Sequence, residues 1–377
     1  MKLSPTKKVT ARILETFDLQ RLNNLIGMVI SGPTGLGEPV YETDGLEKAA
    51  KMYQDFHKSN GINYTEDQAI IGVMVYTLLE NTNTVSSIPP EIMHEITLNG
   101  RVFHKGDIES NKYFQNIHFD EQQHGRFKLG HKSFEKYETF HYDTPKIMLE
   151  TLAIPRIGTF DYQFEYPQIS EDGSTWMSVT PNEIITMEKA IEKAAGNVLT
   201  LGCGMGYYAY MVSEKEEVEH VTIVEKEQDV IDLFNTYILP QFSHKEKITV
   251  IHADAFDFME NLSDGEYDYC FADIWIGNND SVPYMKMKSL CQKFKNMDVS
   301  YWIEDSLVLT IMGYVAIIII EEFFKAQNIK QPEMIQLPED EQYKLDFLRE
   351  LLKNANITRP EHIDYYMNYR NIINLMR

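Results

Sequence analysis

The stretch VLTLGCGMGYY, Val198–Tyr208, determines how we expect the central part of the chain to fold. A mostly apolar run typical of a buried strand leads into three glycines at alternate positions, Gly202, Gly204 and Gly206. Glycine lets the backbone turn tightly and approach a ligand closely, and the start of the following helix offers unpaired N–H groups. The dinucleotide fingerprint G-x-G-x-x-G needs a glycine where this chain has Tyr207, so a nicotinamide cofactor is the weaker interpretation.

Predicted strands and helices alternate from this stretch onward. The strands are near-continuous apolar runs joined by helices, which predicts a parallel sheet covered on both faces. Beyond Asp273 the pattern allows either further strands or one long helix. We expect strands at Val198–Leu201, Val221–Glu225, Ile248–His252 and Tyr267–Ala272, and helices at Gly206–Ser213, Gln228–Tyr237 and Ala255–Asn261.

A hairpin and a capped helix are predicted just before the glycines. The dipeptide Asp172-Gly173 is a turn signal between strand-like segments, so we expect two antiparallel strands between residues 162 and 179. Thr180 then caps a helix that ends near residue 195, and Glu183 completes a capping box with it.

The N-terminal part mixes helical and strand signals and carries no legible chemistry. Two helices are expected, and Thr65 caps the second of them. The dipeptide Asn99-Gly100 supplies the positive φ angles of a tight hairpin turn, so we expect a strand on either side of it. The predicted helices are Gly45–Phe56 and Glu66–Glu80, and the predicted strands are Ile96–Leu98 and Val102–His104.

The C-terminal part is expected to be helical. The apolar run Leu307–Ile320 is shorter than the ~20 residues needed to cross a bilayer, so a buried strand or a core helix explains it better. Helices follow at Glu339–Lys353 and Pro360–Met376, the second capped by Thr358. We therefore divide the chain into an N-terminal α+β accessory region, 1–149, a catalytic domain, 150–325, and a helical C-terminal extension, 326–377.

The charge balance bears on the partners that we expect. With 35 Lys and Arg against 57 Asp and Glu, the net charge of −22 repels phosphate backbones and anionic lipid surfaces. The hydrophobic share of 43% indicates a chain that can bury a core. We expect a small-molecule substrate, no nucleic acid and no membrane partner, and a homodimer is one assembly that the sequence leaves open.

Cysteines and histidines give no sign of a disulfide framework or a metal site. Cys203, Cys270 and Cys291 cannot pair completely and show no C-x-x-C spacing, which indicates a reducing compartment and a cytoplasmic location. A group of histidines in the N-terminal part has neither i,i+4 pairs nor a compact ligand motif, so we expect no metal. These histidines are His104, His118, His124, His131 and His141.

Acidic side chains end the two strands that follow the glycine stretch. Glu225 ends the first of these strands, and Asp254 comes just after the second. In a doubly wound sheet the carboxyl ends of neighbouring strands converge on one crevice. Glu225 can there accept hydrogen bonds from both hydroxyls of a ribose, and Asp254 can accept one from an adenine amino group. Solvated loop acids are the alternative interpretation, which their order along successive strands disfavours.

These motifs together resemble those of the class I S-adenosylmethionine-dependent methyltransferases. They are Gly202–Gly206, Glu225, His252–Ala255 and Tyr267–Asp273, within Gly196–Trp275. The resemblance implies a Rossmann-like doubly wound sheet of the class I methyltransferase type, S-adenosylmethionine as cofactor, and Asp273 at the reaction centre. Thr200 departs from the family, which often has an acid there. By resemblance the cofactor-binding residues are Gly202, Cys203, Gly204, Met205, Gly206, Glu225, Asp254 and Ala255.

Within that superfamily the chain looks most like the spermidine synthases. Asp172-Gly173 and Asn182-Glu183 precede the glycine stretch as a substrate-covering hairpin and a gate-keeping turn do in that family. The polyamine-specific residues do not carry over, which disfavours aminopropyl transfer. A glutamine of that family is Trp176 here, its Tyr-His pair is Thr186-Met187, and the second acid of its catalytic loop is Ile276.

Methyl transfer from S-adenosylmethionine to a nitrogen or oxygen of a small molecule is the leading hypothesis. Asp273 is the candidate catalytic residue, placed to orient or deprotonate the acceptor, and Trp275 beside it is expected to wall the site. Transfer of an aminopropyl or aminocarboxypropyl group to an amine is one alternative. A non-catalytic nucleotide-binding module that serves assembly is the other.

Overall fold

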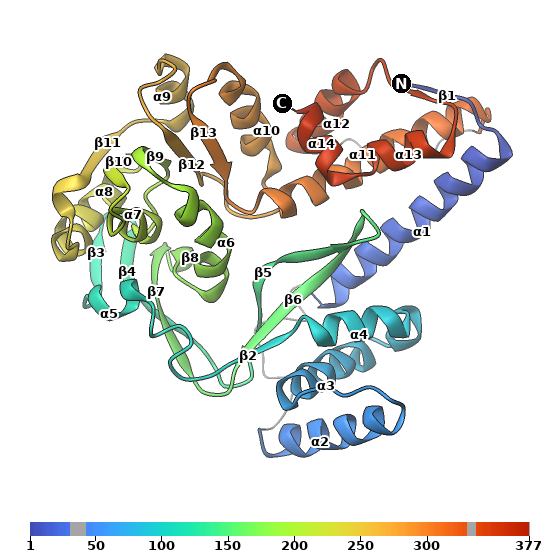
Figure 1. Cartoon of the computed structure of the whole chain (residues 1–377), viewed down its shortest axis with the longest axis horizontal. Helices are drawn as coiled ribbons and strands as arrows, with labels where there is room; N and C mark the ends of the chain where they lie inside the picture. The colour runs from blue at the N-terminus through green and yellow to red at the C-terminus, as the bar shows by residue number, and fades with distance from the viewer. Residues whose placement is uncertain (31–42, 330–336, 377) are drawn as a thin grey trace.

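A five-stranded parallel sheet forms the centre of the region in which the sequence predicts the cofactor site. The structure, a computed structural model, describes residues 1–30, 43–329 and 337–376 (Figure 1). The strand order β11-β10-β9-β12-β13, with every pair parallel, confirms the predicted Rossmann-like sheet. The strands are β9 (Gly196–Leu201), β10 (Val218–Glu225), β11 (Ile248–His252), β12 (Tyr269–Ala272) and β13 (Asp298–Tyr301).

Helices cover both faces of this sheet, as the apolar strands predicted. Alternate residues of β9 point to different cores: Val198 packs with α6 and α7, and Leu199 packs with α10 and the C-terminal helices. The predicted helix over Gln228–Tyr237 is an α-helix that continues as a π-helical turn, Phe234–Ile238. The helices are α6 (Pro181–Lys193), α7 (Tyr207–Ser213), α8 (Gln228–Leu233), α9 (Ala255–Asn261) and α10 (Ser281–Leu290).

Two smaller sheets precede the parallel one. The dipeptide Asp172-Gly173 has φ angles of 49° and 85° and turns β7 into β8, which confirms the predicted hairpin. One sheet has the order β3-β4-β7-β8 and the other β2-β6-β5. Their strands are β2 (Arg101–Phe103), β3 (Gln122–His124), β4 (Phe127–Phe134), β5 (Thr139–Met148), β6 (Leu152–Phe160), β7 (Phe164–Glu171) and β8 (Ser174–Ser178).

The N-terminal helices confirm one prediction and contradict another. Thr65 caps α3, as expected, and it also forms a capping box with Gln68. The hairpin predicted at Asn99-Gly100 is wrong, because residues 96–98 end helix α4 and Asn99 is its C-cap. Of the two predicted strands, only the second forms: it is β2, which pairs in parallel with β6. The helices are α1 (Lys7–Ile30), α2 (Thr43–Ser59), α3 (Glu66–Asn81), α4 (Pro90–Leu98) and α5 (Lys112–Asn116).

The reason for a glycine at position 100 is close packing rather than a turn. A Cβ at Gly100 would overlap the side chain of Ile71, a buried residue of α3. The glycine therefore lets α3 and the end of α4 approach each other, and this tertiary contact cannot be seen in the local sequence.

The C-terminal part is helical, with two departures from prediction. The apolar run lies in one uninterrupted helix, α11 (Glu304–Ala326), which by length and composition alone could cross a membrane. Core helices pass the same test, and α11 packs against α1, α12 and α14. The predicted helix Pro360–Met376 is two helices, since Asn368 caps a new one; Arg359, not Thr358, is the N-cap of the first. The later helices are α12 (Glu339–Leu351), α13 (Pro360–Tyr366) and α14 (Tyr369–Leu375).

Helix α1 connects the N-terminal and C-terminal parts. Val9 and Ile13 at its start are buried with the C-terminal helices, and Ile26 and Ile30 at its end are buried with α3 and β6. Figure 1 shows α1 running from the C-terminal helices towards α4. The short strand β1 (Lys2–Leu3) also pairs with β14 (Asn356–Ile357). The boundary expected between residues 149 and 150 falls in the β5–β6 hairpin, so both sides of it share one sheet.

We expect Gly206→Ala to lower the free energy of unfolding more than Gly61→Ala. Both glycines have positive φ, at 70° and 85°, where an L-residue loses about 1–2 kcal/mol. A Cβ at Gly206 would also overlap the ring of Phe234, whereas nothing lies within 4 Å of one at Gly61. Urea unfolding of both variants measures the difference, and equal losses would contradict a packing role for Gly206.

Candidate functional site

The candidate site lies where the order of the parallel strands reverses. The chain continues from β9 to β10 on one side and reaches β12 on the other, and such switch points open a crevice at the carboxyl ends of the strands. Leu201 of β9 pairs with Ala272 of β12, so Gly202 and Asp273 leave the sheet side by side. The Asp273 N–H donates to the Leu201 carbonyl at 2.9 Å.

The glycine loop has a backbone conformation and a closeness to its neighbours that residues with side chains could not adopt without strain. Gly202, Gly204 and Gly206 have φ angles of 98°, 52° and 70°. A Cβ at Gly202 would overlap the Asp273 carbonyl oxygen, and one at Gly204 would lie 3.0 Å from Met177 Cε on β8. The loop is therefore packed tightly between the end of β12 and the β7–β8 hairpin.

A small cavity of ≈ 90 Å³ lies above this loop. Strand β8 covers it, and the three tryptophans of the chain all line it. None of its lining residues is Lys, Arg or His. Of the predicted site residues, the structure brings Gly202, Cys203, Gly204, Met205, Asp273 and Trp275 to this cavity, while Gly206, Glu225, Asp254 and Ala255 lie outside its lining.

Two acids line the cavity without a cation. Glu183 accepts hydrogen bonds from the Thr180 N–H (2.6 Å), the Thr180 hydroxyl (3.1 Å) and the Ser178 hydroxyl (3.3 Å). Burial nonetheless raises the pKa of Glu183 to about 7. Burial, and then the charges of Glu183 and Glu225, raise the pKa of Asp273 well above its usual range. Among the residues that the structure describes, none donates a hydrogen bond to the Asp273 carboxyl.

Aromatic side chains complete the walls. The hydroxyl of Tyr208 is buried and has no hydrogen-bond partner within the described ranges, and its ring stacks on Phe271 at 4.2 Å. A buried hydroxyl without a partner is costly, so it is a candidate donor or acceptor for a bound molecule. Trp275, expected at the site, is 4% exposed and donates its indole N–H to the Trp302 carbonyl at 3.2 Å.

Cys203 and Met205 belong to the loop's packing. Cys203 is 7% exposed, and burial and then the charge of Glu225 raise the pKa of its thiol well above the usual range. The Met205 carbonyl accepts a hydrogen bond from the Tyr113 hydroxyl at 2.6 Å. Helix α5, which carries Tyr113, therefore fixes the outer side of the glycine loop.

Glu225 supports the glycine loop directly. Its Oε2 accepts the Cys203 N–H at 2.9 Å, and its Oε1 accepts the N–H groups of Lys226 and Glu227 at 2.8 and 2.9 Å. A carboxylate has about four acceptor positions, so one remains, at Oε2. The contact of Glu225 with both hydroxyls of a ribose stays a prediction.

Asp254 and Ala255 begin helix α9. Asp254 is its N-cap, and its Oδ1 accepts the N–H groups of Phe256 and Asp257 at 2.8 and 3.3 Å. The side chain of Ala255 is buried in the core on the same side of the sheet as α10. A capping role therefore accounts for Asp254 in the structure, and its contact with adenine stays a prediction.

Trp302 lines the cavity without any signal for it in the sequence. Glu183 was predicted as a helix cap and, by resemblance, as part of a gate-keeping turn. The capping box placed Glu183 correctly at the start of α6, but nothing in the sequence shows that this helix end faces Asp273.

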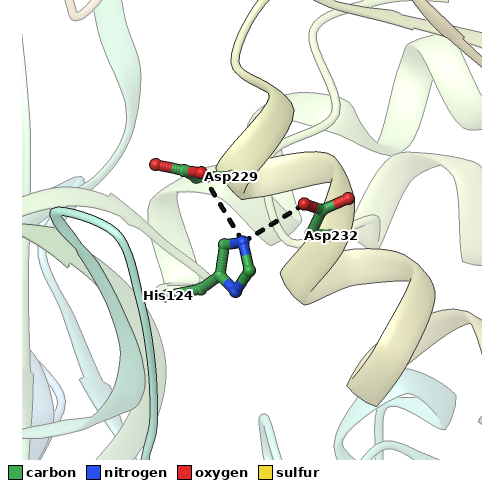
Figure 2. A group of neighbouring side chains, drawn as sticks. All are labelled: His124, Asp229 and Asp232. Carbon is green, nitrogen blue, oxygen red and sulfur yellow. Dashed lines mark ion pairs between the residues drawn. The ribbon is translucent and has the colours of Figure 1, made fainter.

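A separate cluster joins β3 to α8. Figure 2 shows His124 between Asp229 and Asp232, whose ligand atoms all lie within 4.8 Å of one another. The His124 Nε2 lies 3.2 Å from Asp232 and 3.6 Å from Asp229, and all three side chains are partly exposed. His124 lies far from Asp229 and Asp232 in the sequence, so no local motif predicted the cluster. Their contacts with each other account for the cluster as a link between strand β3 and helix α8.

Comparison with known proteins points to one family for part of the chain. Residues 180–293 match the family model of the spermine/spermidine synthase domain, which is less than half of the chain. Among curated proteins, none matches this sequence.

Solved structures resemble the chain only distantly. The spermidine synthase from Thermotoga maritima is 14% identical, with a TM-score of 0.30, over 42% of this chain and 60% of that one. A spermidine synthase in complex with the transition-state analogue AdoDATO is 15% identical, with a TM-score of 0.30, over 42% and 61%. The Trypanosoma brucei PRMT1 enzyme–prozyme complex with AdoHcy is 16% identical, with a TM-score of 0.24, over 32% and 37%. The chain thus spans less than two thirds of these proteins.

The raised pKa of Glu183 predicts a pH-dependent stability. Between its ordinary value of 4.5 and about 7, the folded protein holds a proton that the unfolded chain has released. The free energy of unfolding should therefore fall as the pH rises through this window. Glu183→Gln preserves a capping residue at this position and should flatten the fall in Tm between pH 5 and 8. The exposed Glu192→Gln on the same helix is the control, and an equal slope in all three proteins would refute the assignment.

Proposed function

We propose that the chain transfers an aminopropyl-type group from an S-adenosyl sulfonium donor to an amine. The observation that carries this proposal is the pair of cation-free acids, Glu183 and Asp273, which line one cavity beside the glycine loop. Burying two carboxyls together without a counter-charge is unfavourable. A bound cation would offset this cost, and both a sulfonium and an amine supply one.

The lining of the cavity favours a donor without a carboxylate. S-adenosylmethionine carries a carboxylate near the sulfonium, and a cationic side chain would stabilise it. The cavity contains no Lys, Arg or His, and it contains two acids that would repel the carboxylate. Thr200 lines the same cavity and adds no charge. Decarboxylated S-adenosylmethionine has only an amine at that end, which suits the acids.

The family comparison supports the same choice. The match to the spermine/spermidine synthase domain spans residues 180–293, which begin at the cap of α6 and include the glycine loop and Asp273. The sequence alone favoured methyl transfer, because the polyamine-specific residues were absent. The family match and the charge of the cavity now favour the aminopropyl alternative.

Asp273 and Glu183 would act on the acceptor amine. The sulfonium supplies an activated carbon, whose bond to sulfur breaks, with its electron pair passing to sulfur, as the amine nitrogen forms its new bond. The amine must present a lone pair, and a carboxylate with a raised pKa is suited to take the amine's proton near neutral pH. Asp273 is the better candidate for this role, since no described group already donates to its carboxyl. The enclosing aromatic rings exclude water from the reacting atoms.

The direct test compares donors with equal amounts of protein. Decarboxylated S-adenosylmethionine, labelled in its propyl chain, is incubated with a series of α,ω-diaminoalkanes. We expect label in the amine and release of 5′-methylthioadenosine. Labelled methyl groups in the amine when S-adenosylmethionine is supplied would instead support methyl transfer, and absence of transfer from both donors would refute the proposal.

Asp273→Asn is expected to reduce turnover by roughly 10²–10⁴-fold, the usual effect of losing a positioned base. The exposed Asp257→Asn on α9, outside the cavity, is the matched control. Single-turnover kinetics at saturating donor measure the chemical step, and titration with 5′-methylthioadenosine measures nucleoside binding. Unchanged turnover in Asp273→Asn would exclude Asp273 as the base.

A further inference from the structure

His124, Asp229 and Asp232, here called the β3–α8 cluster, bring an imidazole and two carboxylates together at the surface of the protein (Figure 2). His124 ends β3, and the two aspartates lie three residues apart on α8, so they share one face of this helix. None of the three lines the cavity beside the glycine loop. The cluster is therefore separate from the site of the proposed reaction.

The imidazole of His124 cannot donate a hydrogen bond to both carboxylates. Its Nε2 lies 3.2 Å from Asp232 Oδ2 and 3.6 Å from Asp229 Oδ1, and Figure 2 shows it facing the space between them. A ring nitrogen carries at most one proton, and the 3.6 Å separation is too long for a hydrogen bond. One carboxylate thus receives no donor from the histidine. A single cation in this space would contact all three groups.

The spacing of the three ligand atoms fits a bound divalent ion. Bonds of about 2.0–2.2 Å from zinc to nitrogen and oxygen place neighbouring ligand atoms about 3.4 Å apart in a tetrahedron. The distances of 3.2 and 3.6 Å from the His124 Nε2 lie on either side of this value. All three ligand atoms are within 4.8 Å of one another. The two carboxylates also offset the charge of a divalent ion.

Neighbouring residues hold both carboxylates in place. Gln228 donates from its Nε2 to Asp232 Oδ1 at 2.8 Å, which leaves Oδ2 for His124. Gly125 has φ of 55°, and a Cβ there would overlap Asp229 Oδ2, so the glycine lets this carboxylate approach the turn after β3. Outer contacts of this kind orient the ligands of metal sites.

The arginine of the same turn is engaged elsewhere. Arg126 forms ion pairs with Glu171 and Glu227. In the part of the chain that the structure describes, no Lys or Arg forms an ion pair with Asp229 or Asp232. The net charge of −22 adds a long-range attraction for cations. The two aspartates are therefore open to a cation from solution.

We propose that the β3–α8 cluster binds a divalent first-row transition-metal ion of the zinc type, with water in its remaining positions. An imidazole ligand suits such ions, whereas calcium and magnesium prefer oxygen ligands. The ion would fasten β3, and with it the sheet β3-β4-β7-β8, to α8, which packs on β10 and β11. Local ligand spacing predicted no metal site, but here the acids come from a helix that is distant in the sequence.

Titration of tag-free protein with Zn²⁺, after dialysis against a chelator, tests this proposal. We expect one ion per chain at micromolar Zn²⁺, with the affinity reduced about tenfold or more in His124→Gln and in Asp232→Asn. His244→Gln is the matched control, because His244 is similarly exposed but pairs with one carboxylate, that of Glu246. Co²⁺ should give visible d–d absorption in wild type and in the control, and lose it in the two cluster variants.

Thermal unfolding supplies a second measurement, which needs no substrate and is independent of the proposed reaction. A ligand that binds only the folded chain stabilises it, so Zn²⁺ should raise the Tm of wild type and of His244→Gln but not that of His124→Gln. Near-UV circular dichroism of the metal-free proteins checks that each variant folds, and Asp229→Asn replaces either cluster variant that does not. Binding at millimolar Zn²⁺ only, or wild-type affinity in the cluster variants, would overturn the proposal.

Discussion

The pairing of β9 with β12 is the constraint on which the site depends. It brings the glycine loop and Asp273 to the same edge of the sheet, so closely that a side chain at Gly202 would overlap the Asp273 backbone. The Glu225 carboxylate then fixes the loop from the neighbouring strand through the Cys203 N–H. The register of three parallel strands thus sets the floor of the cavity before any ligand contributes.

Glu183 and Asp273, the acids at this floor, oppose folding when they are charged. Burial raises the pKa values of Glu183 and Asp273 because a charged carboxyl is poorly solvated there. The local hydrogen bonds of the capping box reduce this penalty for Glu183 without removing it. The same residue thus caps a helix and carries a buried acid, a conflict of the kind that is found at many functional sites.

Local signals in the sequence predicted local structure correctly. The glycine stretch, the cap at Thr65, the capping box at Thr180 and the turn at Asp172-Gly173 depend on neighbouring residues, and each forms as expected. The same logic failed at Asn99-Gly100, where the glycine is required by Ile71, far away in sequence. For this reason the sequence predicted the loop and Asp273 but not the cavity that they line together with Glu183 and Trp302.

A second cavity, of ≈ 450 Å³, adjoins the first, and the two linings come mostly from different parts of the chain. The glycine loop and the acids lie within residues 180–293, which match a known family, while His141 and the α1 wall lie in the preceding part. Because one fold supports many reactions, substrate choice has to come from groups added around the shared site. Helix α1 is packed into two cores at its two ends, so the wall that it supplies is rigid.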